Sequence, residues 1–203
     1  MDSFNKIPPH GVIRGWLGAQ FIERLLLCAQ SNEHFFKETT VASGTSHRID
    51  PTSRISRRFG DLGDLKHELK AKVRELLPEM LTTLGKKPFN PTFELELVAH
   101  GDGAFFTEHI DTLTGPERGG RHRIISAVYY FHALPKAFSG GVLRLHSLAA
   151  TDPQHAFVDI PPDYDTLVFF PSMFPHEVLP VTLQSKKFLD SRFAINCWIC
   201  RAA

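Results

Sequence analysis

The sequence has few cysteines and no excess of charge of either sign. Three cysteines occur in 203 residues, Cys28, Cys197 and Cys200, an odd number without the spacing of a disulfide framework. This favours a reducing compartment, and we predict a cytoplasmic protein. Lys and Arg number 23 against 22 Asp and Glu, so the composition does not predict the broad basic surface that binds nucleic acid or an anionic membrane.

Long hydrophobic runs are also missing. No stretch approaches the roughly 18 apolar residues of a membrane span, and residues 1–16 lack a cationic start followed by an apolar run. We therefore expect neither membrane insertion nor secretion. A length of 203 residues suits one domain with its own core, so we look for a single active site.

The first ninety residues favour helices. Residues 17–36 carry apolar side chains at helical spacing, and residues 64–84 carry a longer apolar stripe before Gly85. Pro78 lies inside the second stripe and predicts a kink or a split. The Ser43–Gly63 segment between them is polar and long for a simple connector. We expect residues 1–90 to form an N-terminal helical support with a lid-like loop, although a solvated surface loop is an equal alternative.

Several arginines of this segment leave two interpretations open. They can pair with an acidic or carboxylate-bearing substrate, or they can remain solvated surface charges, and the sequence selects none of them for binding. They are Arg48, Arg54, Arg57 and Arg58.

After residue 90 the pattern changes to short strands between Gly, Pro and Asp turns. About eight strands are expected, at 93–100, 105–110, 123–131, 141–146, 156–160, 165–170, 176–181 and 192–199. This number is typical of a jelly-roll, or double-stranded β-helix. The predicted fold class is therefore α+β, with N-terminal helices that support a jelly-roll core of residues 91–203 as one compact unit.

Two histidines and one aspartate form a candidate metal site. His109 and Asp111 are two residues apart in FFTEHIDT, so on a strand both side chains project from one face. His176 follows an apolar strand and a Pro-bounded turn in FFPSMFPHEV, which sets its direction. Two imidazoles and one carboxylate on one face of an octahedral ion suit nonheme iron(II) with open positions. A zinc hydrolase can use a similar set, and an isolated His-x-Asp also occurs in solvated turns.

The second half of the chain resembles the prolyl 4-hydroxylase-like branch of the Fe(II)/2-oxoglutarate-dependent oxygenases. The resemblance runs from about Phe93 to Trp198 and rests on DGAFFTEHIDT, RIISAVYY, SGGVLRL, DTLVFFPS, HEVLPV and RFAINCW, in this order. It implies that His109, Asp111 and His176 hold a catalytic Fe(II). It also implies 2-oxoglutarate as cosubstrate and O₂ as oxidant.

The resemblance further implies a binding site for the cosubstrate. Arg192 corresponds to the basic residue that holds the far carboxylate of 2-oxoglutarate, a task that suits the fork of a guanidinium. Tyr130 is expected to donate its hydroxyl to the same carboxylate. Asn196 lies on the strand face of Arg192, where the family often has a small hydroxylated residue near the cosubstrate.

Two departures from the family pattern affect this site. His100 stands close to where the family often has a tyrosine that faces the cosubstrate, and an imidazole can donate the same hydrogen bond. Lys186 and Lys187 lie nearer than Arg192 to the family's usual distance from the last histidine. Either lysine is therefore an alternative carboxylate partner. Arg192 is favoured because it opens a strand that matches the family.

The implied activity is hydroxylation of an unactivated C–H bond, with succinate and CO₂ as coproducts. A prolyl residue in a protein or peptide is the substrate that the resemblance favours, and a free amino acid or a natural-product intermediate is the alternative. A noncatalytic metal- or ligand-binding jelly-roll is an alternative of another class. Such a protein would have no reason to combine Arg192 and Tyr130 with the three metal ligands. The oligomeric state is not predicted.

Overall fold

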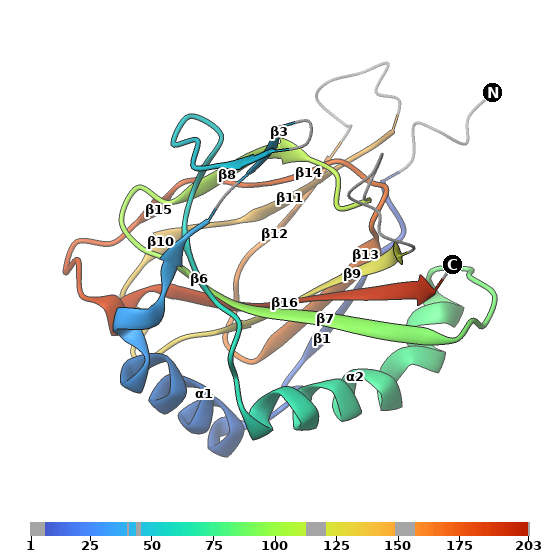
Figure 1. Ribbon diagram of the computed structural model, residues 1–203, viewed down its shortest axis with the longest axis horizontal. Coiled ribbons are helices and arrows are strands. Elements are labelled where there is room, and N and C mark those ends of the chain that lie inside the picture. The colour runs from blue at the N-terminus through green and yellow to red at the C-terminus, as the bar shows by residue number, and fades with distance from the viewer. Residues whose placement is uncertain (1–6, 40, 44–45, 113–120, 149–156, 203) are drawn as a thin grey trace.

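The computed structural model describes residues 7–39, 41–43, 46–112, 121–148 and 157–202. Two helices lie beneath a seven-stranded sheet, and a five-stranded sheet lies on the opposite side of that sheet (Figure 1). The helices are α1 (Ala19–Ser31) and α2 (Asp64–Thr83), and two short 3-10 helices span Glu33–Phe35 and Phe188–Asp190. The fold therefore has a helical layer and two sheet layers.

The strands pair with antiparallel neighbours in both sheets. The seven-stranded sheet has the order β1-β13-β9-β16-β7-β6-β2, and the five-stranded sheet has the order β12-β11-β14-β8-β5. The first consists of β1 (Gly11–Arg14), β2 (Lys37–Glu38), β6 (Arg57–Phe59), β7 (Pro91–His100), β9 (Arg121–Phe131), β13 (Thr166–Pro171) and β16 (Arg192–Ala202). The second consists of β5 (Arg54–Ile55), β8 (Phe105–His109), β11 (Leu143–His146), β12 (Phe157–Ile160) and β14 (His176–Val178). Two further pairs are β3 (Val41–Ser43) with β4 (Ser46–Arg48), and β10 (Ser139–Gly140) with β15 (Val181–Thr182).

The predicted jelly-roll with supporting helices is confirmed. The strand expected at 156–160 is present as β12, and Ala156 lies outside the described residues. The strand expected at 176–181 is divided into β14 and β15. Pro180 lies in the interruption and has no N–H for a sheet hydrogen bond, while the N–H of Leu179 bonds to the carbonyl of Val142.

The first ninety residues supply strands as well as helices. β1, β2 and β6 extend the seven-stranded sheet, and β5 extends the five-stranded sheet. The Ser43–Gly63 segment, expected as a loop, thus contains β4, β5 and β6. The split expected at Pro78 does not occur, and α2 continues past this residue to Thr83. Pro78 has no N–H to donate to the carbonyl of Arg74, one turn earlier. Both residues are exposed, so water can bond to this carbonyl.

Alternation along β16 separates two cores. Phe193 and Ile195 point toward the helices and join the large cluster that includes α1 and α2. Ala194 points the other way, into a smaller cluster between the two sheets. Because side chains alternate along a strand, Arg192 and Asn196 share the face of Ala194. The fold therefore directs these two polar side chains into the space between the sheets.

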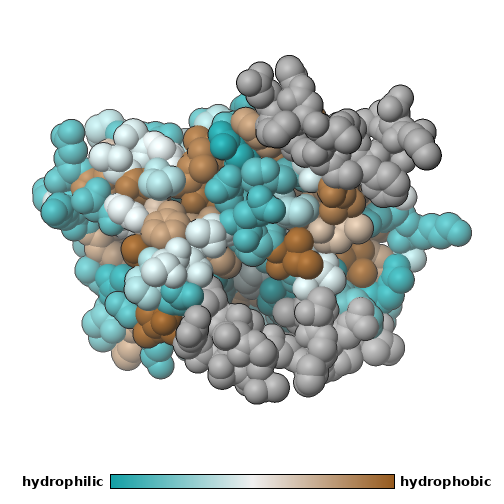
Figure 2. Space-filling view, turned by 90° about the horizontal axis from the view of Figure 1, so that it is seen from above, coloured by the Kyte–Doolittle hydropathy of each residue, from teal (hydrophilic) through white to brown (hydrophobic). Residues whose placement is uncertain are grey.

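The surface of the described residues is mixed in polarity. On the face shown in Figure 2, hydrophilic side chains are interspersed with hydrophobic ones. Scattered exposed apolar side chains are normal on a protein surface. No helix in the described part of the chain is long and apolar enough to cross a membrane.

Asp165 connects the start of α1 to the seven-stranded sheet. Its carboxylate accepts hydrogen bonds from the N–H groups of Leu17 (2.9 Å) and Gly18 (2.8 Å) and from the hydroxyl of Tyr129 (2.7 Å). Asp165 is buried and has φ 51°, a left-handed conformation that Asp tolerates better than most residues. Burial and this hydrogen bond raise the pKa of Tyr129, so its phenol stays a donor.

We predict that Asp165→Ala lowers the free energy of unfolding by about 3 kcal/mol, because three donors lose a charged acceptor. Chemical denaturation measures this loss. Asp163→Ala is the matched control, since Asp163 is 43% exposed and its ion pair with Arg14 is distant, at 3.9 Å. Its loss should stay below about 0.5 kcal/mol. Equal losses in the two variants would contradict the role assigned to Asp165.

Candidate metal centre and cosubstrate pocket

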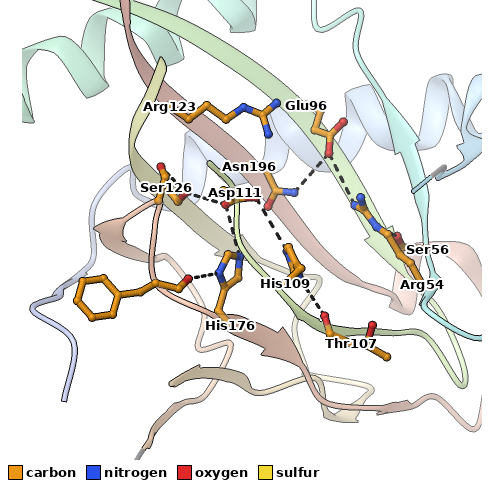
Figure 3. Close-up of polar contacts among 12 residues, drawn as sticks. Arg54, Ser56, Glu96, Thr107, His109, Asp111, Arg123, Ser126, His176 and Asn196 are labelled. Carbon is orange, nitrogen blue, oxygen red and sulfur yellow. Dashed lines mark hydrogen bonds and ion pairs between the residues drawn. The ribbon is translucent and has the colours of Figure 1, made fainter. Parts of the chain in front are cut away.

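His109, Asp111 and His176 meet between the two sheets (Figure 3). β8 and β14 are paired so that His109 and His176 stand directly opposite each other, with ring centroids 4.2 Å apart. Each oxygen of Asp111 faces one imidazole: Oδ1 is 3.9 Å from Nε2 of His109, and Oδ2 is 3.4 Å from Nε2 of His176. The candidate ligand atoms all lie within 4.8 Å of one another. One ion can therefore contact all three side chains.

Backbone carbonyls orient both imidazoles. Nδ1 of His109 lies 2.8 Å from the carbonyl of Thr107, and Nδ1 of His176 lies 3.0 Å from the carbonyl of Phe174. When Nδ1–H donates to a carbonyl, Nε2 carries a lone pair and no proton. Both Nε2 atoms then offer lone pairs on the side of Asp111, which is how metal-binding histidines are commonly held.

Asp111 is positioned by two serines. The strand expected at 105–110 ends at His109, and the N–H of Asp111 bonds to the carbonyl of Ser172 at 3.0 Å. The hydroxyl of Ser126 donates to Oδ2 of Asp111 at 2.6 Å and lies 2.9 Å from the hydroxyl of Ser172. Our sequence interpretation missed Ser126. Its position four residues before Tyr130 on one strand, and hence on the same face, was the available signal.

The protonation states of His109 and Asp111 suit a cation. Burial lowers the pKa of His109 to about 3, and the neighbouring His176 adds to this effect. Burial acts against the charged forms of His176 and Asp111, but their mutual attraction outweighs it, so the pKa of His176 is raised and that of Asp111 is lowered. At neutral pH His109 is therefore neutral and Asp111 is a carboxylate, the forms that bind a metal.

Arg192 is buried between the same sheets, at 1% exposure. Its Nε donates to the carbonyl of Gly141 at 2.7 Å, and its Nη1 lies 3.1 Å from Nδ1 of His100. Because a guanidinium only donates, Nδ1 of His100 accepts and the imidazole proton sits on Nε2. Burial, followed by the charges of Arg192 and Arg54, lowers the pKa of His100 well below its usual value. His100 is therefore a neutral support for the Arg192 side chain.

Two donors of this group have no acceptor among the described residues: Nη2 of Arg192 and the hydroxyl of Tyr130. The guanidinium carbon lies 4.8 Å from the centre of the Tyr130 ring, so the two side chains that carry these donors are neighbours. Burial raises the pKa of Tyr130 to about 12 against the opposing charge of Arg192, which keeps the phenol protonated. A buried unpaired donor costs about 1–3 kcal/mol. A carboxylate from outside the chain would accept from both donors.

Gly141 leaves room for the Arg192 side chain. A Cβ at this position would lie 2.5 Å from Cδ of Arg192, and the backbone has φ +65°, which favours glycine. Our sequence interpretation did not single out Gly141, because a Gly-Gly pair before a strand also indicates an ordinary turn.

The remaining predicted site residues lie apart from these two donors. Asn196 shares the strand face of Arg192, but its amide nitrogen lies 3.5 Å from Oε1 of Glu96. Lys186 and Lys187 are exposed in the loop before β16. The structure thus brings Arg192, Tyr130 and His100 together and leaves the two lysines on the surface.

A relative of known sequence is similar over most of this chain. An uncharacterized PKHD-type hydroxylase of Synechocystis sp. is 33% identical over 198 residues, which cover 94% of this chain and 62% of that protein. The chain therefore spans about three fifths of the length of this relative.

Solved structures share the fold. A prolyl-4-hydroxylase of Pseudomonas putida has a TM-score of 0.68 at 20% identity, covering 97% of this chain and 94% of its own. A prolyl hydroxylase of Trichoplax adhaerens, solved with a hypoxia inducible factor peptide fragment, has a TM-score of 0.69 at 23% identity, covering 95% of this chain and 83% of its own.

The family match covers the part of the chain that contains the three candidate metal ligands and the candidate cosubstrate residues. The pattern of the 2OG-Fe(II) oxygenase superfamily matches residues 95–200, more than half of the 203 residues. This chain belongs to the 2OG-Fe(II) oxygenase superfamily.

Proposed function

We propose that the protein is an Fe(II)- and 2-oxoglutarate-dependent dioxygenase that hydroxylates an unactivated C–H bond, with succinate and CO₂ as coproducts. The observation that carries this proposal is the donor pair of Arg192 and Tyr130, which has no acceptor in the described part of the chain. These donors lie in the same interior space as the His109, Asp111 and His176 triad. A hydrolase or a noncatalytic metal-binding jelly-roll would explain the triad but not the two donors of Arg192 and Tyr130. A dicarboxylate cosubstrate explains the second site as well.

Each residue has a defined task in this proposal. The triad holds Fe(II), and the ion supplies the O₂ activation that oxidises the substrate. Arg192 and Tyr130 hold the far carboxylate of 2-oxoglutarate, and His100 fixes the guanidinium through Nη1. Asn196 is proposed to line the same space without contacting Arg192.

The proposed substrate is a prolyl residue in a protein or peptide. Support comes from two solved neighbours that are prolyl hydroxylases, one of Pseudomonas putida and one of Trichoplax adhaerens that was solved with a peptide fragment. A free amino acid or a natural-product intermediate is the alternative. A cytoplasmic location, and the division into a support of residues 1–90 and a core of residues 91–203, stay predictions.

The direct test is an anaerobic titration with Fe(II), with and without 2-oxoglutarate. The chelate of both should give a weak visible charge-transfer band that neither gives alone. Subsequent exposure to O₂ should form succinate even without substrate. A protein that binds the metal but shows no chelate band and no succinate would contradict the proposal.

We predict that Ala at any one of the triad positions removes most of this uncoupled succinate formation. Loss of a ligand should exceed the 10–100-fold effect typical of an outer residue of a metal site. The circular dichroism spectrum should stay close to that of the wild type. His67→Ala is the control, because His67 is exposed on α2. Activity like that of the wild type in all three variants would refute the ligand assignment.

We predict that Ser126→Ala weakens the binding of Fe(II) about 10–100-fold, because Asp111 loses the hydroxyl that orients its carboxylate. The change keeps all three ligands, so binding should persist at higher metal concentration. Titration with Fe(II) or Co(II), followed by absorption, measures the affinity. Ser185→Ala is the control, since this exposed hydroxyl bonds to Asp190 in a surface loop. Equal affinities for the metal in the two variants would contradict the role assigned to Ser126.

We predict that Arg192→Met weakens the binding of 2-oxoglutarate about a hundredfold, or about 2.7 kcal/mol. The physical reason is that the cosubstrate carboxylate would be left in a buried site without its cation. Lys186→Met and Lys187→Met are matched controls and should change the affinity less than about threefold. The charge-transfer band measures the affinity at fixed Fe(II). A large loss in a lysine variant, with Arg192→Met near wild type, would reverse the assignment.

A further inference from the structure

Three polar side chains converge beside the triad: Arg54, Glu96 and Asn196 (Figure 3). Glu96 on β7 and Asn196 on β16 are direct cross-strand partners in the seven-stranded sheet. Arg54 comes from β5, which pairs with β8, the strand that ends at His109. The group is thus built from both sheets and lies on one side of the candidate metal site.

Arg54 is held in place independently of Glu96. Its Nε donates to the hydroxyl of Ser56 at 3.0 Å, and its guanidinium carbon lies 4.5 Å from the centre of the Phe106 ring. The Phe106 ring in turn stacks on the imidazole of His109, with centroids 3.5 Å apart and an angle of 18°. Phe106 therefore contacts both the guanidinium and a proposed metal ligand. A group bound by Arg54 would lie close to the reaction centre.

Donors and positive charges exceed acceptors in this group. Nη2 of Arg54 is 3.7 Å, and Nδ2 of Asn196 is 3.5 Å, from the same oxygen of Glu96, while Nη1 of Arg58 is 3.6 Å from the other oxygen. Good N–H···O hydrogen bonds measure about 2.7–3.2 Å, so all three contacts are long. Two guanidinium cations also face the one carboxylate of Glu96. The carboxylate of Asp111 attracts Arg54 as well, but Asp111 is assigned to the metal.

A second ion pair, within the seven-stranded sheet, has closer contacts than the Arg54 and Glu96 pair. Arg123 donates to Oε2 of Glu94 from Nη2 at 2.7 Å and from Nε at 3.1 Å, which is a closed pair. The Arg54 and Glu96 side chains are each 12% exposed, yet they do not close in this way. Desolvation of a guanidinium is offset only by close acceptors, and Glu96 does not provide them.

The other arginines of the segment are less suited to bind a ligand beside the triad. Arg57 donates to the carbonyl of Glu33 at 2.8 Å and packs against the Phe188 ring. Arg58 is 51% exposed. The side chain of Arg48 lies outside the described residues.

We infer that Arg54 binds a carboxylate of the substrate, with the amide of Asn196 as a second donor. This inference rests on the proposed function and specifies the substrate class of the same site. The carboxylate belongs either to a small molecule such as a free amino acid or to the free C-terminus of a peptide. When substrate is absent, the carboxylate of Glu96 partly balances the positive charges of Arg54 and Arg58. A carboxylate held here places its neighbouring C–H bonds beside the triad.

The test uses the anaerobic Fe(II) and 2-oxoglutarate complex of the whole chain. The chelate band is recorded first, because its absence would refute the proposed function itself. Two sets of probes are then titrated while shifts of the band are followed. One set holds the twenty standard L-amino acids and their amides, and the other holds acetyl-Ala-Ala-Pro peptides with a free or an amidated C-terminus.

If Arg54 recognises a carboxylate, the wild type should prefer an acid to its amide and Arg54→Gln should not. At least one acid should bind about tenfold or more tightly than its amide. Arg54→Gln should abolish this preference by weakening the acid about tenfold while changing the amide less than about twofold. Arg144→Gln is the control, because Arg144 pairs with Asp159 at the exposed edge of the five-stranded sheet. It should keep the preference.

The two probe sets identify the source of the carboxylate. A preference among the amino acids assigns a small molecule, and a preference among the peptides assigns a C-terminus. The inference is overturned if the chelate band forms but no acid in either set binds better than its amide. It is also overturned if Arg54→Gln keeps the preference. Affinity for 2-oxoglutarate should stay within about twofold in Arg54→Gln, which separates this role from that of Arg192 and from misfolding.

Discussion

The register between β8 and β14 is the constraint on which the site depends. It places His109 directly opposite His176 and lets Asp111, just beyond β8, reach both imidazoles. A slip of one residue would turn one histidine to the other face of the sheet. The carbonyl of Ser172, which binds the N–H of Asp111, comes from the segment before β14 and supports the same alignment.

The fold separates stability from chemistry by the two faces of the seven-stranded sheet. The face toward α1 and α2 carries the large apolar core, while the face toward the second sheet carries a small apolar cluster and the polar side chains of the site. Buried charges such as Arg192 are costly. The helical side supplies apolar burial that can offset this cost, so the interior between the sheets can retain unpaired donors for ligands.

Much of the fold followed from local patterns. Alternation in RFAINCWI predicted that Arg192 and Asn196 share a face opposite Phe193, and β16 has this arrangement. The helix at 64–84 followed from its apolar stripe. The strands within Ser43–Gly63 were missed, because β5 and β6 are only two and three residues long and owe their conformation to pairing with β8 and β7. Short edge strands carry too little periodicity to be recognised.

Residue order alone predicts the jelly-roll class and the three candidate metal ligands, because both follow from spacing and alternation along single strands. The preference for Arg192 over the two lysines also needed the resemblance to the oxygenase family. The folded chain was needed to show that Ser126 orients Asp111, that His100 supports Arg192, and that Arg54 stands beside the triad with long contacts to Glu96. Each of these pairs joins segments far apart in the chain. Their distances arise from the packing of two sheets, which no local pattern encodes.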